Sequence, residues 1–202
     1  MNPKRTKSFW IENLGFLDKM LFKMRVKRVL KGMDLDDKTI LDTWCGYNAM
    51  TLQYIQKKYK PKKLIAMDLK LNISHLRDVS IEAIEWNLNE EWKLKEECDV
   101  ILSTAILEHL ENPDDYLKYV YKNLKKGGKL LMTIPSVYAK PVLEFMAYKL
   151  KIINKEEILD HKDYYNKKKL LWKLQQVGFK KEKIKHSYFQ LFMNNYIKAI
   201  KW

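Results

Sequence analysis

The segment from Ile40 to Asn48 constrains the fold of this chain more than any other. An apolar run, Ile-Leu-Asp, leads into the turn Thr-Trp-Cys-Gly-Tyr-Asn, and helical spacing of apolar residues starts near Met50. A strand, a tight turn and a helix N-terminus together place backbone N–H groups and a partial positive charge at one point. The sequence therefore predicts a site for a polar ligand, of the kind that binds nucleotide-type cofactors, at the end of this strand.

Short apolar segments alternate with helical ones along the rest of the chain, which is typical of an α/β fold with helices on both faces of a mostly parallel sheet. Seven strands are expected, at 38–42, 63–67, 81–86, 98–103, 129–134, 182–188 and 192–200. The last two are expected to pair as a hairpin, so that the final strand is antiparallel. A helix is expected to begin after Asn112 as N-cap, with Pro113 in its first turn, and to stop at Gly127 and Gly128.

The formal charge is +14, from 39 Lys and Arg against 25 Asp and Glu. An anionic partner would fit this charge, whether nucleic acid, a phosphorylated substrate or a membrane surface. Because the lysines are spread along the chain without a separate basic tail, solvated lysine-rich helix faces are the favoured interpretation.

Residues 8–31 form an expected basic amphipathic helix. One stripe holds Trp10, Leu14, Leu17, Leu21 and Met24, and another holds Lys19, Lys23 and Lys27. Packing over the chain's own domain is the favoured role of this helix, and contact with an anionic membrane surface is the alternative.

The two cysteines, Cys45 and Cys98, lie in or beside expected core strands without metal-ligand spacing. Reduced thiols in a cytoplasmic protein, with no metal site, are therefore expected. The apolar stretches are short and interrupted by charges, so neither a signal peptide nor a transmembrane span is expected.

Four segments in order resemble the motifs of class I S-adenosylmethionine-dependent methyltransferases of the small-molecule type. Residues 40–48 resemble the glycine-rich first motif, and Ile65-Ala-Met-Asp68 resembles the second. Residues 98–110 resemble the fourth-strand block, and residues 124–135 the helix-to-fifth-strand block. The resemblance covers residues 36–200 and implies a Rossmann-like fold. It divides a single domain, 1–202, into the helix at 8–31, a cofactor-binding half at 36–135, a helical cap at 136–160 and a C-terminal helix and hairpin at 161–202.

The resemblance also implies the cofactor, S-adenosylmethionine with S-adenosylhomocysteine as product, and residues that bind it. A carboxylate offers two oxygens, so Asp68 is expected to accept both ribose hydroxyls. Asp42 is expected near the methionine portion, and Asn87 near the adenine. The implied cofactor-binding residues are Asp42, Trp44, Gly46, Asp68, Leu69, Asn87, Leu88 and Thr104.

The first motif departs from the family pattern, because the implied glycines at positions 44, 46 and 48 are Trp, Gly and Asn here. Asn48 can adopt a positive φ more readily than most residues. Trp44 must either clash with the cofactor or turn into another pocket, and a positive φ there would store about 1–3 kcal/mol of strain.

His109 and His161 are the candidate general bases for a hydroxyl acceptor, because imidazole titrates near neutral pH. A purely structural role is the alternative for each. Residues expected to contact the acceptor are Glu108, Tyr138, Tyr164 and Tyr165. The cap and the tyrosines resemble methyltransferases of surface-glycan pathways, which implies a sugar or nucleotide-linked sugar as acceptor.

Two other functions stay open at this point. One is a methyltransferase-like binding or partner protein whose cofactor loop is impaired by Trp44. The other is an RNA methyltransferase, which the net charge suggests, although no added RNA-binding module is evident. The sequence leaves the oligomeric state open.

Overall fold

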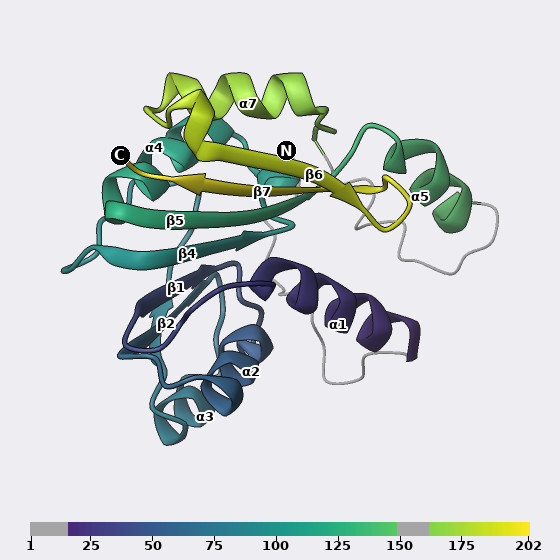
Figure 1. Ribbon diagram of the computed structural model, residues 1–202. Coiled ribbons are helices and arrows are strands. Elements are labelled where there is room, and N and C mark those ends of the chain that lie inside the picture. The colour runs from purple at the N-terminus through teal and green to yellow at the C-terminus, as the bar shows by residue number, and fades with distance from the viewer. Residues whose placement is uncertain (1–15, 149–161) are drawn as a thin grey trace.

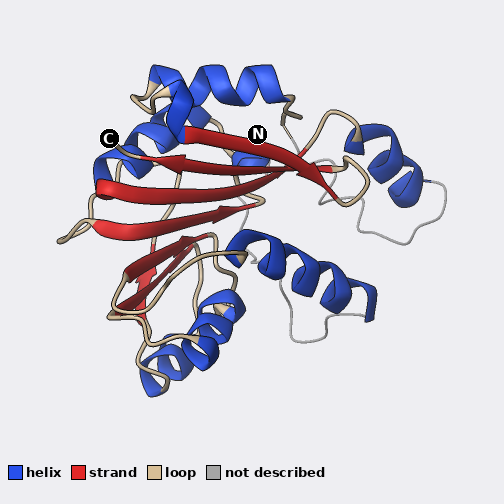
Figure 2. Ribbon diagram, viewed as in Figure 1, coloured by secondary structure: helices blue, strands red, loops and turns tan. Residues whose placement is uncertain are grey.

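A computed structural model of the chain describes residues 16–148 and 162–202. It contains a seven-stranded sheet between helices (Figures 1 and 2). The strands are β1 (Thr39–Thr43), β2 (Lys63–Asp68), β3 (Glu82–Glu85), β4 (Cys98–Thr104), β5 (Leu124–Pro135), β6 (Ile184–Phe189) and β7 (Asn194–Ile200). The helices are α1 (Phe16–Leu30), α2 (Met50–Lys58), α3 (Ile73–Asp78), α4 (Pro113–Asn123), α5 (Ala139–Tyr148) and α7 (Lys167–Gln176), with 3-10 turns η1 (Leu107–His109) and η2 (Lys181–Lys183).

The strand order is β3-β2-β1-β4-β5-β7-β6. Strands β1 to β5 are parallel, and β7 runs antiparallel between β5 and β6. The expected sheet, with its antiparallel last strand and its closing hairpin, is therefore confirmed. The carboxyl ends of the parallel strands meet at one edge, where ligands bind in open α/β sheets.

The two faces of the sheet carry separate apolar cores, as the period-two alternation of buried strand residues requires. One core joins α1, α2 and α3 to strand residues such as Ile40, Leu64 and Leu102. The other joins α4 and α7 to strand residues such as Leu41 and Ile101. Figure 2 shows these two groups of helices on either side of the sheet. Helices therefore cover both faces of the sheet, which leaves the carboxyl ends of the parallel strands as the place for a ligand.

Gly127 and Gly128 do not stop α4 as expected, because α4 already ends at Asn123 and both glycines lie inside β5. They form an irregularity where the β4–β5 register shifts between Cys98 and Val100. Gly127 has φ 79°, and its N–H donates to the Lys201 carbonyl at 2.8 Å. A Cβ on Gly128 would lie 2.7 Å from the Lys125 carbonyl oxygen. These glycines therefore permit a bulge rather than a helix stop.

Helix α1 packs over the chain's own sheet, which is the favoured alternative from the sequence, but with a different stripe. Val26, Val29 and Leu30 are buried, whereas Met24 is 44% exposed. The stripe that included Met24 is therefore wrong at that position, and Trp10 and Leu14 lie outside the described residues. In the part of the chain that the structure describes, no helix has the length and apolar character needed to span a membrane.

Candidate functional site

The candidate site lies at the carboxyl end of β1. In the strand order β1 is flanked by β2 and β4, and the crossover helices on its two sides cover opposite faces of the sheet. This reversal is the topological switch point, where a crevice opens outside the strand ends. Asp42 is the residue before the last one of β1, Asp68 ends β2 and Thr104 ends β4. The fold thus brings together residues from segments far apart in the sequence.

Asp68 is tied to the first-motif loop by its carboxylate. Its Oδ2 accepts the Gly46 N–H at 2.8 Å, and its Oδ1 accepts the Leu69 N–H at 2.7 Å. The residue is only 3% exposed. Because each carboxylate oxygen has two acceptor positions, both oxygens keep capacity for a further donor. Two backbone amides therefore orient Asp68 for a ligand that offers a pair of hydroxyl groups.

Asp42 is a buried carboxylate whose two oxygens have no hydrogen-bond partner in the structure. It is 1% exposed, and burial, followed by repulsion from Asp68, raises its pKa well above the usual range. A buried charge without a partner is costly, so the group must either hold a proton or receive a donor from a bound molecule. Asp42 thus marks a place where a cationic or strongly donating ligand group fits.

Trp44 has the backbone conformation of a glycine. Its φ is 72°, the same as that of Gly46, and its N–H donates to the Met67 carbonyl at 2.8 Å. Asn48 does not adopt a positive φ; the neighbouring Ala49 does so, at φ 47°, directly before α2. The expectation for Asn48 is therefore wrong by one position. The loop keeps a glycine-type path although two of its three expected glycines are absent.

The indole of Trp44 stacks on the imidazole of His109, with ring centroids 5.8 Å apart and an interplanar angle of 21°. His109 lies in η1 after β4, whereas Asp68 lies at the end of β2, on the other side of β1. The Trp44 side chain thus points toward the β4 side of the site, and which of the two outcomes expected for it applies to a bound cofactor stays a prediction. Trp44 and His109 together form an aromatic wall on the β4 side of the site.

A buried hydroxyl network under the site could not be found from the sequence. Tyr116 of α4 is fully buried. Its hydroxyl is hydrogen-bonded to Thr43 Oγ1 at 2.6 Å and donates to Ser103 Oγ at 2.8 Å. Burial raises the pKa of Tyr116, and nearby Asp42 and Glu108 add to that shift. The three hydroxyl groups join α4 to the carboxyl ends of β1 and β4. Tyr116 reads in the sequence only as one apolar position of a helix.

Asn87, expected near the adenine, and Leu88, expected to bind the cofactor, have local roles in the structure. The Asn87 amide donates to Glu90 at 3.0 Å, and its carbonyl accepts the Asn89 N–H at 3.1 Å, which closes a turn. Leu88 is 3% exposed and belongs to the core. Thr104 is half-buried at the end of β4. Cofactor binding by these three residues stays a prediction, and the Asn87 side chain would have to leave its turn partners to contact the adenine.

The residues expected to contact the acceptor are spread over different depths. Tyr138 is 57% exposed and Tyr164 is half-buried, whereas Tyr165 is fully buried in the core. Because protein covers its ring, Tyr165 cannot stack on an acceptor in this structure, contrary to expectation. Glu108 is also buried, at 1% exposed. The second candidate base, His161, lies outside the described residues.

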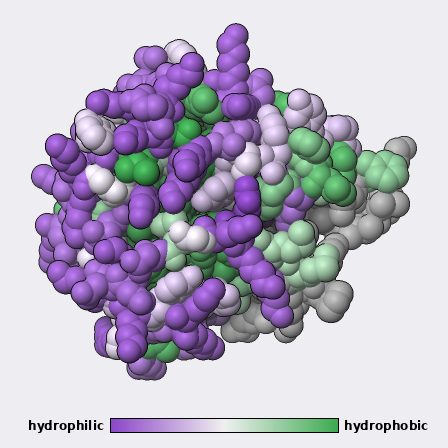
Figure 3. All heavy atoms as spheres, in the orientation of Figure 1, coloured by the Kyte–Doolittle hydropathy of each residue, from purple (hydrophilic) through white to green (hydrophobic). Residues whose placement is uncertain are grey.

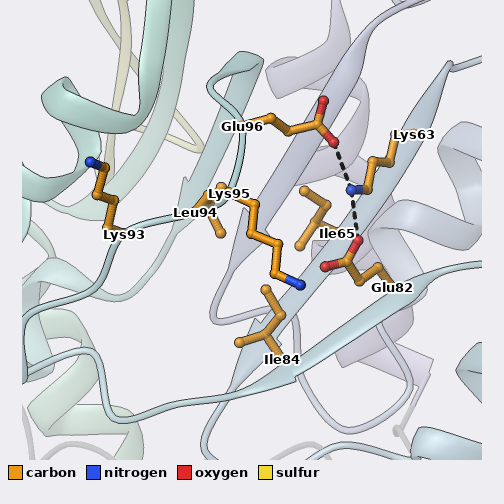
Figure 4. A pocket seen from close by; sticks show the side chains of 8 residues that line it. All are labelled: Lys63, Ile65, Glu82, Ile84, Lys93, Leu94, Lys95 and Glu96. Atoms are coloured by element: carbon orange, nitrogen blue, oxygen red, sulfur yellow. Dashed lines mark hydrogen bonds and ion pairs between the residues drawn. The ribbon is translucent and has the colours of Figure 1, made fainter.

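A separate pocket lies at the opposite edge of the sheet (Figure 4). Lys63 begins β2 and Glu82 begins β3, and the Lys63 ammonium contacts Glu82 at 2.8 Å and Glu96 at 2.7 Å. This ion-pair cluster occupies the amino ends of the strands, away from Asp42 and Asp68. Among the described residues, no group of three or more His, Cys, Asp or Glu is arranged to hold a metal ion.

The family model described as a methyltransferase domain matches residues 19–184 of this chain. The mitochondrial ubiquinone biosynthesis O-methyltransferase of Dictyostelium discoideum is 21% identical over an alignment of 150 residues, and the match covers 66% of this chain and 44% of that protein. The chain therefore spans less than half the length of this curated relative.

Solved structures share the fold at low sequence identity. A chain from the complex between the Haloferax volcanii Trm112 methyltransferase activator and a protein described as a methyltransferase has a TM-score of 0.71 and 10% identity. The alignment covers 91% of this chain and 93% of that one. An S-adenosylmethionine-dependent methyltransferase from Mesorhizobium loti has a TM-score of 0.67 and 14% identity, with 87% and 95% coverage.

Proposed function

The chain belongs to the class I S-adenosylmethionine-dependent methyltransferases, and from this premise we propose that it methylates a hydroxyl oxygen of a small polar acceptor. S-adenosylmethionine supplies a methyl group already attached to its leaving group, so positioning dominates what the protein must add. The chain's own residues therefore have two tasks. They bind and orient the cofactor, and they hold the acceptor while its proton is removed.

The single observation that carries the proposal is the unpartnered, buried carboxylate of Asp42 beside the amide-held carboxylate of Asp68. The cofactor offers donors of both kinds, an amino group and a ribose diol. Asp68 would hold the ribose hydroxyls, and Asp42 would face the methionine amino group, directly or through water. Gly46 and Ala49 keep the loop backbone in the left-handed conformations that leave room for close approach.

His109 is the base in this proposal. As the acceptor oxygen bonds to the methyl carbon and the bond from that carbon to sulfur breaks, the hydroxyl proton passes to the His109 imidazole. The Trp44 ring stacked on His109 limits the orientations of the imidazole. Trp44 is thus a positioning residue in this reaction. The same proposal includes a catalytic contribution of His161, which is tested by measuring methyl transfer in a His161 variant.

The acceptor class that we propose is a sugar or nucleotide-linked sugar of a glycan pathway in the cytoplasm. The exposed Tyr138 and the half-buried Tyr164 support it, because tyrosine rings stack on sugar faces and donate hydrogen bonds. A second acceptor class, a phenolic hydroxyl, is favoured by the curated relative, whose name places it in ubiquinone biosynthesis. Both acceptors present a hydroxyl group, so they share the base and the cofactor site.

Calorimetric titration with S-adenosylmethionine and S-adenosylhomocysteine tests the cofactor site. We expect binding by the native chain and its loss in Asp68→Ala, with Asp115→Ala, an acid of the first turn of α4, as the matched control that binds normally. Absence of binding until Trp44 becomes Gly would overturn the enzyme proposal in favour of a methyltransferase-like binding protein. Salt-sensitive RNA binding would favour the RNA methyltransferase. Formation of S-adenosylhomocysteine with nucleotide sugars or with catechols then separates the acceptor classes.

A further inference from the structure

The turn between β6 and β7 is strained and exposes apolar side chains. Gln190, Leu191 and Phe192 have φ values of 50°, 54° and 66°, so three consecutive non-glycine residues are left-handed. Leu191 is 90% exposed and Phe192 is 62% exposed. Gly or Asn would suit these backbone angles better, and at Leu191 either would cost almost no buried contact. The fold alone thus gives no reason for Leu191, and Phe192 leaves most of its surface exposed, which points to a contact outside the chain.

The tip continues into a larger apolar patch on the same edge. The Phe192 ring lies 5.5 Å from the Tyr188 ring, which lies 5.8 Å from the ring of Tyr138, just before α5. Val142 and Phe145 of α5 are 41% and 55% exposed. We call this set the apolar edge; its members are Val137, Tyr138, Val142, Phe145, Leu191 and Phe192. In Figure 3 hydrophobic atoms gather at this side of an otherwise mostly hydrophilic surface.

A strongly basic helix and an acid-free hairpin flank the apolar edge. Residues 16–31 contain six Lys or Arg and one acid, and residues 184–200 contain no acid. Helix α1 lies against the hairpin, because Arg28 donates to the Ser187 hydroxyl and stacks 4.9 Å from the Tyr196 ring. On α1, Met20 and Met24 are 43% and 44% exposed, and Lys23 and Lys27 are also exposed. Apolar side chains between solvent-exposed cations match the chemistry of an anionic lipid interface.

We propose that the apolar edge, with α1 beside it, docks the protein on the surface of an anionic lipid bilayer. Leu191 and Phe192 enter the boundary between headgroups and acyl chains, and the α1 cations meet the anionic headgroups. A second copy of the chain fits the patch less well, because each copy carries +14 and the basic rims would repel. If the proposed methyl transfer holds, docking turns the carboxyl edge of the sheet toward the bilayer, so that an acceptor anchored there reaches the site.

Vesicle co-sedimentation of the full chain tests this docking. We expect binding to vesicles of mixed phosphatidylglycerol and phosphatidylcholine, weaker binding at high salt, and little binding to phosphatidylcholine alone. The variant Leu191→Asn/Phe192→Asn should bind at least tenfold more weakly. Its melting temperature should equal or exceed that of the native chain, because Asn accepts left-handed backbone angles. Lost binding with retained stability separates a docking role from a folding role.

The matched control is Trp172→Gln, which removes an exposed aromatic side chain, 57% accessible, from α7 outside the apolar edge. It should bind vesicles like the native chain. Unchanged vesicle binding by the double variant would overturn the proposal. So would light scattering that shows a native dimer which the double variant dissociates, because the patch would then join two copies. Calorimetry with S-adenosylhomocysteine on the same variants is independent, so failure of the proposed enzyme and failure of docking are distinguishable.

Discussion

Replacing Trp44 tests whether its glycine-type backbone stores strain. A non-glycine residue in the left-handed region costs about 1–2 kcal/mol, and Trp44 has φ 72°. Trp44→Gly removes this cost, but it loses the stack on His109, worth about 0.5–1.5 kcal/mol, and part of the burial of the indole. It also gives the unfolded chain more freedom, about 0.5–1 kcal/mol. We therefore expect a net destabilisation of about 1 kcal/mol.

Comparison with Trp44→Ala isolates the strain, because both variants lose the same indole contacts. At an ordinary position Ala is more stable than Gly by about 0.5–1 kcal/mol. At φ 72° the order should reverse, with Trp44→Gly the more stable variant by up to about 1 kcal/mol. Urea denaturation followed by circular dichroism measures the free energy of unfolding of each variant.

The control for this comparison is the pair Trp172→Gly and Trp172→Ala, at an exposed position inside α7. There Ala should be more stable than Gly by about 1 kcal/mol, the usual order in a helix. If Trp44→Ala equals or exceeds Trp44→Gly in stability, the loop is not strained at this residue and the reasoning fails. Cofactor affinity should change less than about threefold in Trp44→Gly, because the indole faces His109 rather than Asp68.

Three further substitutions test the surroundings of the site. Because the folded state raises the pKa of Asp42, the native chain should lose stability as pH rises from the unfolded pKa of about 4 toward the folded one. Asp42→Asn should remove this loss. If the difference in unfolding free energy between the native chain and Asp42→Asn stays constant from pH 4 to 8, the prediction is wrong. Tyr116→Phe removes the hydroxyl that bonds the buried Thr43 and Ser103 side chains, and it should lower the unfolding free energy by about 1–3 kcal/mol. The control Tyr119→Phe, at a half-buried position, should lower it little. Gly128→Ala places a Cβ 2.7 Å from a backbone oxygen and should lower thermal stability by a few degrees or prevent folding; an unchanged melting temperature would mean that the bulge is pliable.

Periodicity and boundary residues were enough to predict the sheet, because alternating strands and helices leave few topologies. They also placed Asp42 and Asp68 at the ends of neighbouring strands. Side-chain depth was not predictable in the same way. Tyr138 and Tyr165 look alike in the sequence, but Tyr138 is 57% exposed, whereas Tyr165, in the loop before α7, is buried in the core and its backbone pairs with Ser136 just after β5. Depth depends on packing between distant segments, which local patterns do not record.

The sequence predicted a glycine-type loop after β1, but the prediction was wrong about one of the positions with positive φ. The resemblance implied glycines at positions 44, 46 and 48, and the structure has positive φ at positions 44, 46 and 49. The shift by one residue puts Ala49 at the N-cap and leaves the Asn48 amide to accept from Asn72 at 3.1 Å. This side-chain hydrogen bond joins residues that are 24 positions apart in the sequence. No local propensity includes such a bond.

Left-handed backbone angles at apolar residues connect the proposed reaction with the proposed docking. Among the described residues, the apolar side chains with positive φ are those of Trp44, Ala49, Ala105, Leu191 and Phe192. All of them follow the carboxyl ends of β1, β4 or β6. The other positive-φ residues that are not glycine, Asp37, Ser80 and Gln190, are polar. Substitutions that relax strain at Leu191 and Phe192 should therefore raise stability while they lower vesicle binding, a trade-off expected where strain serves function.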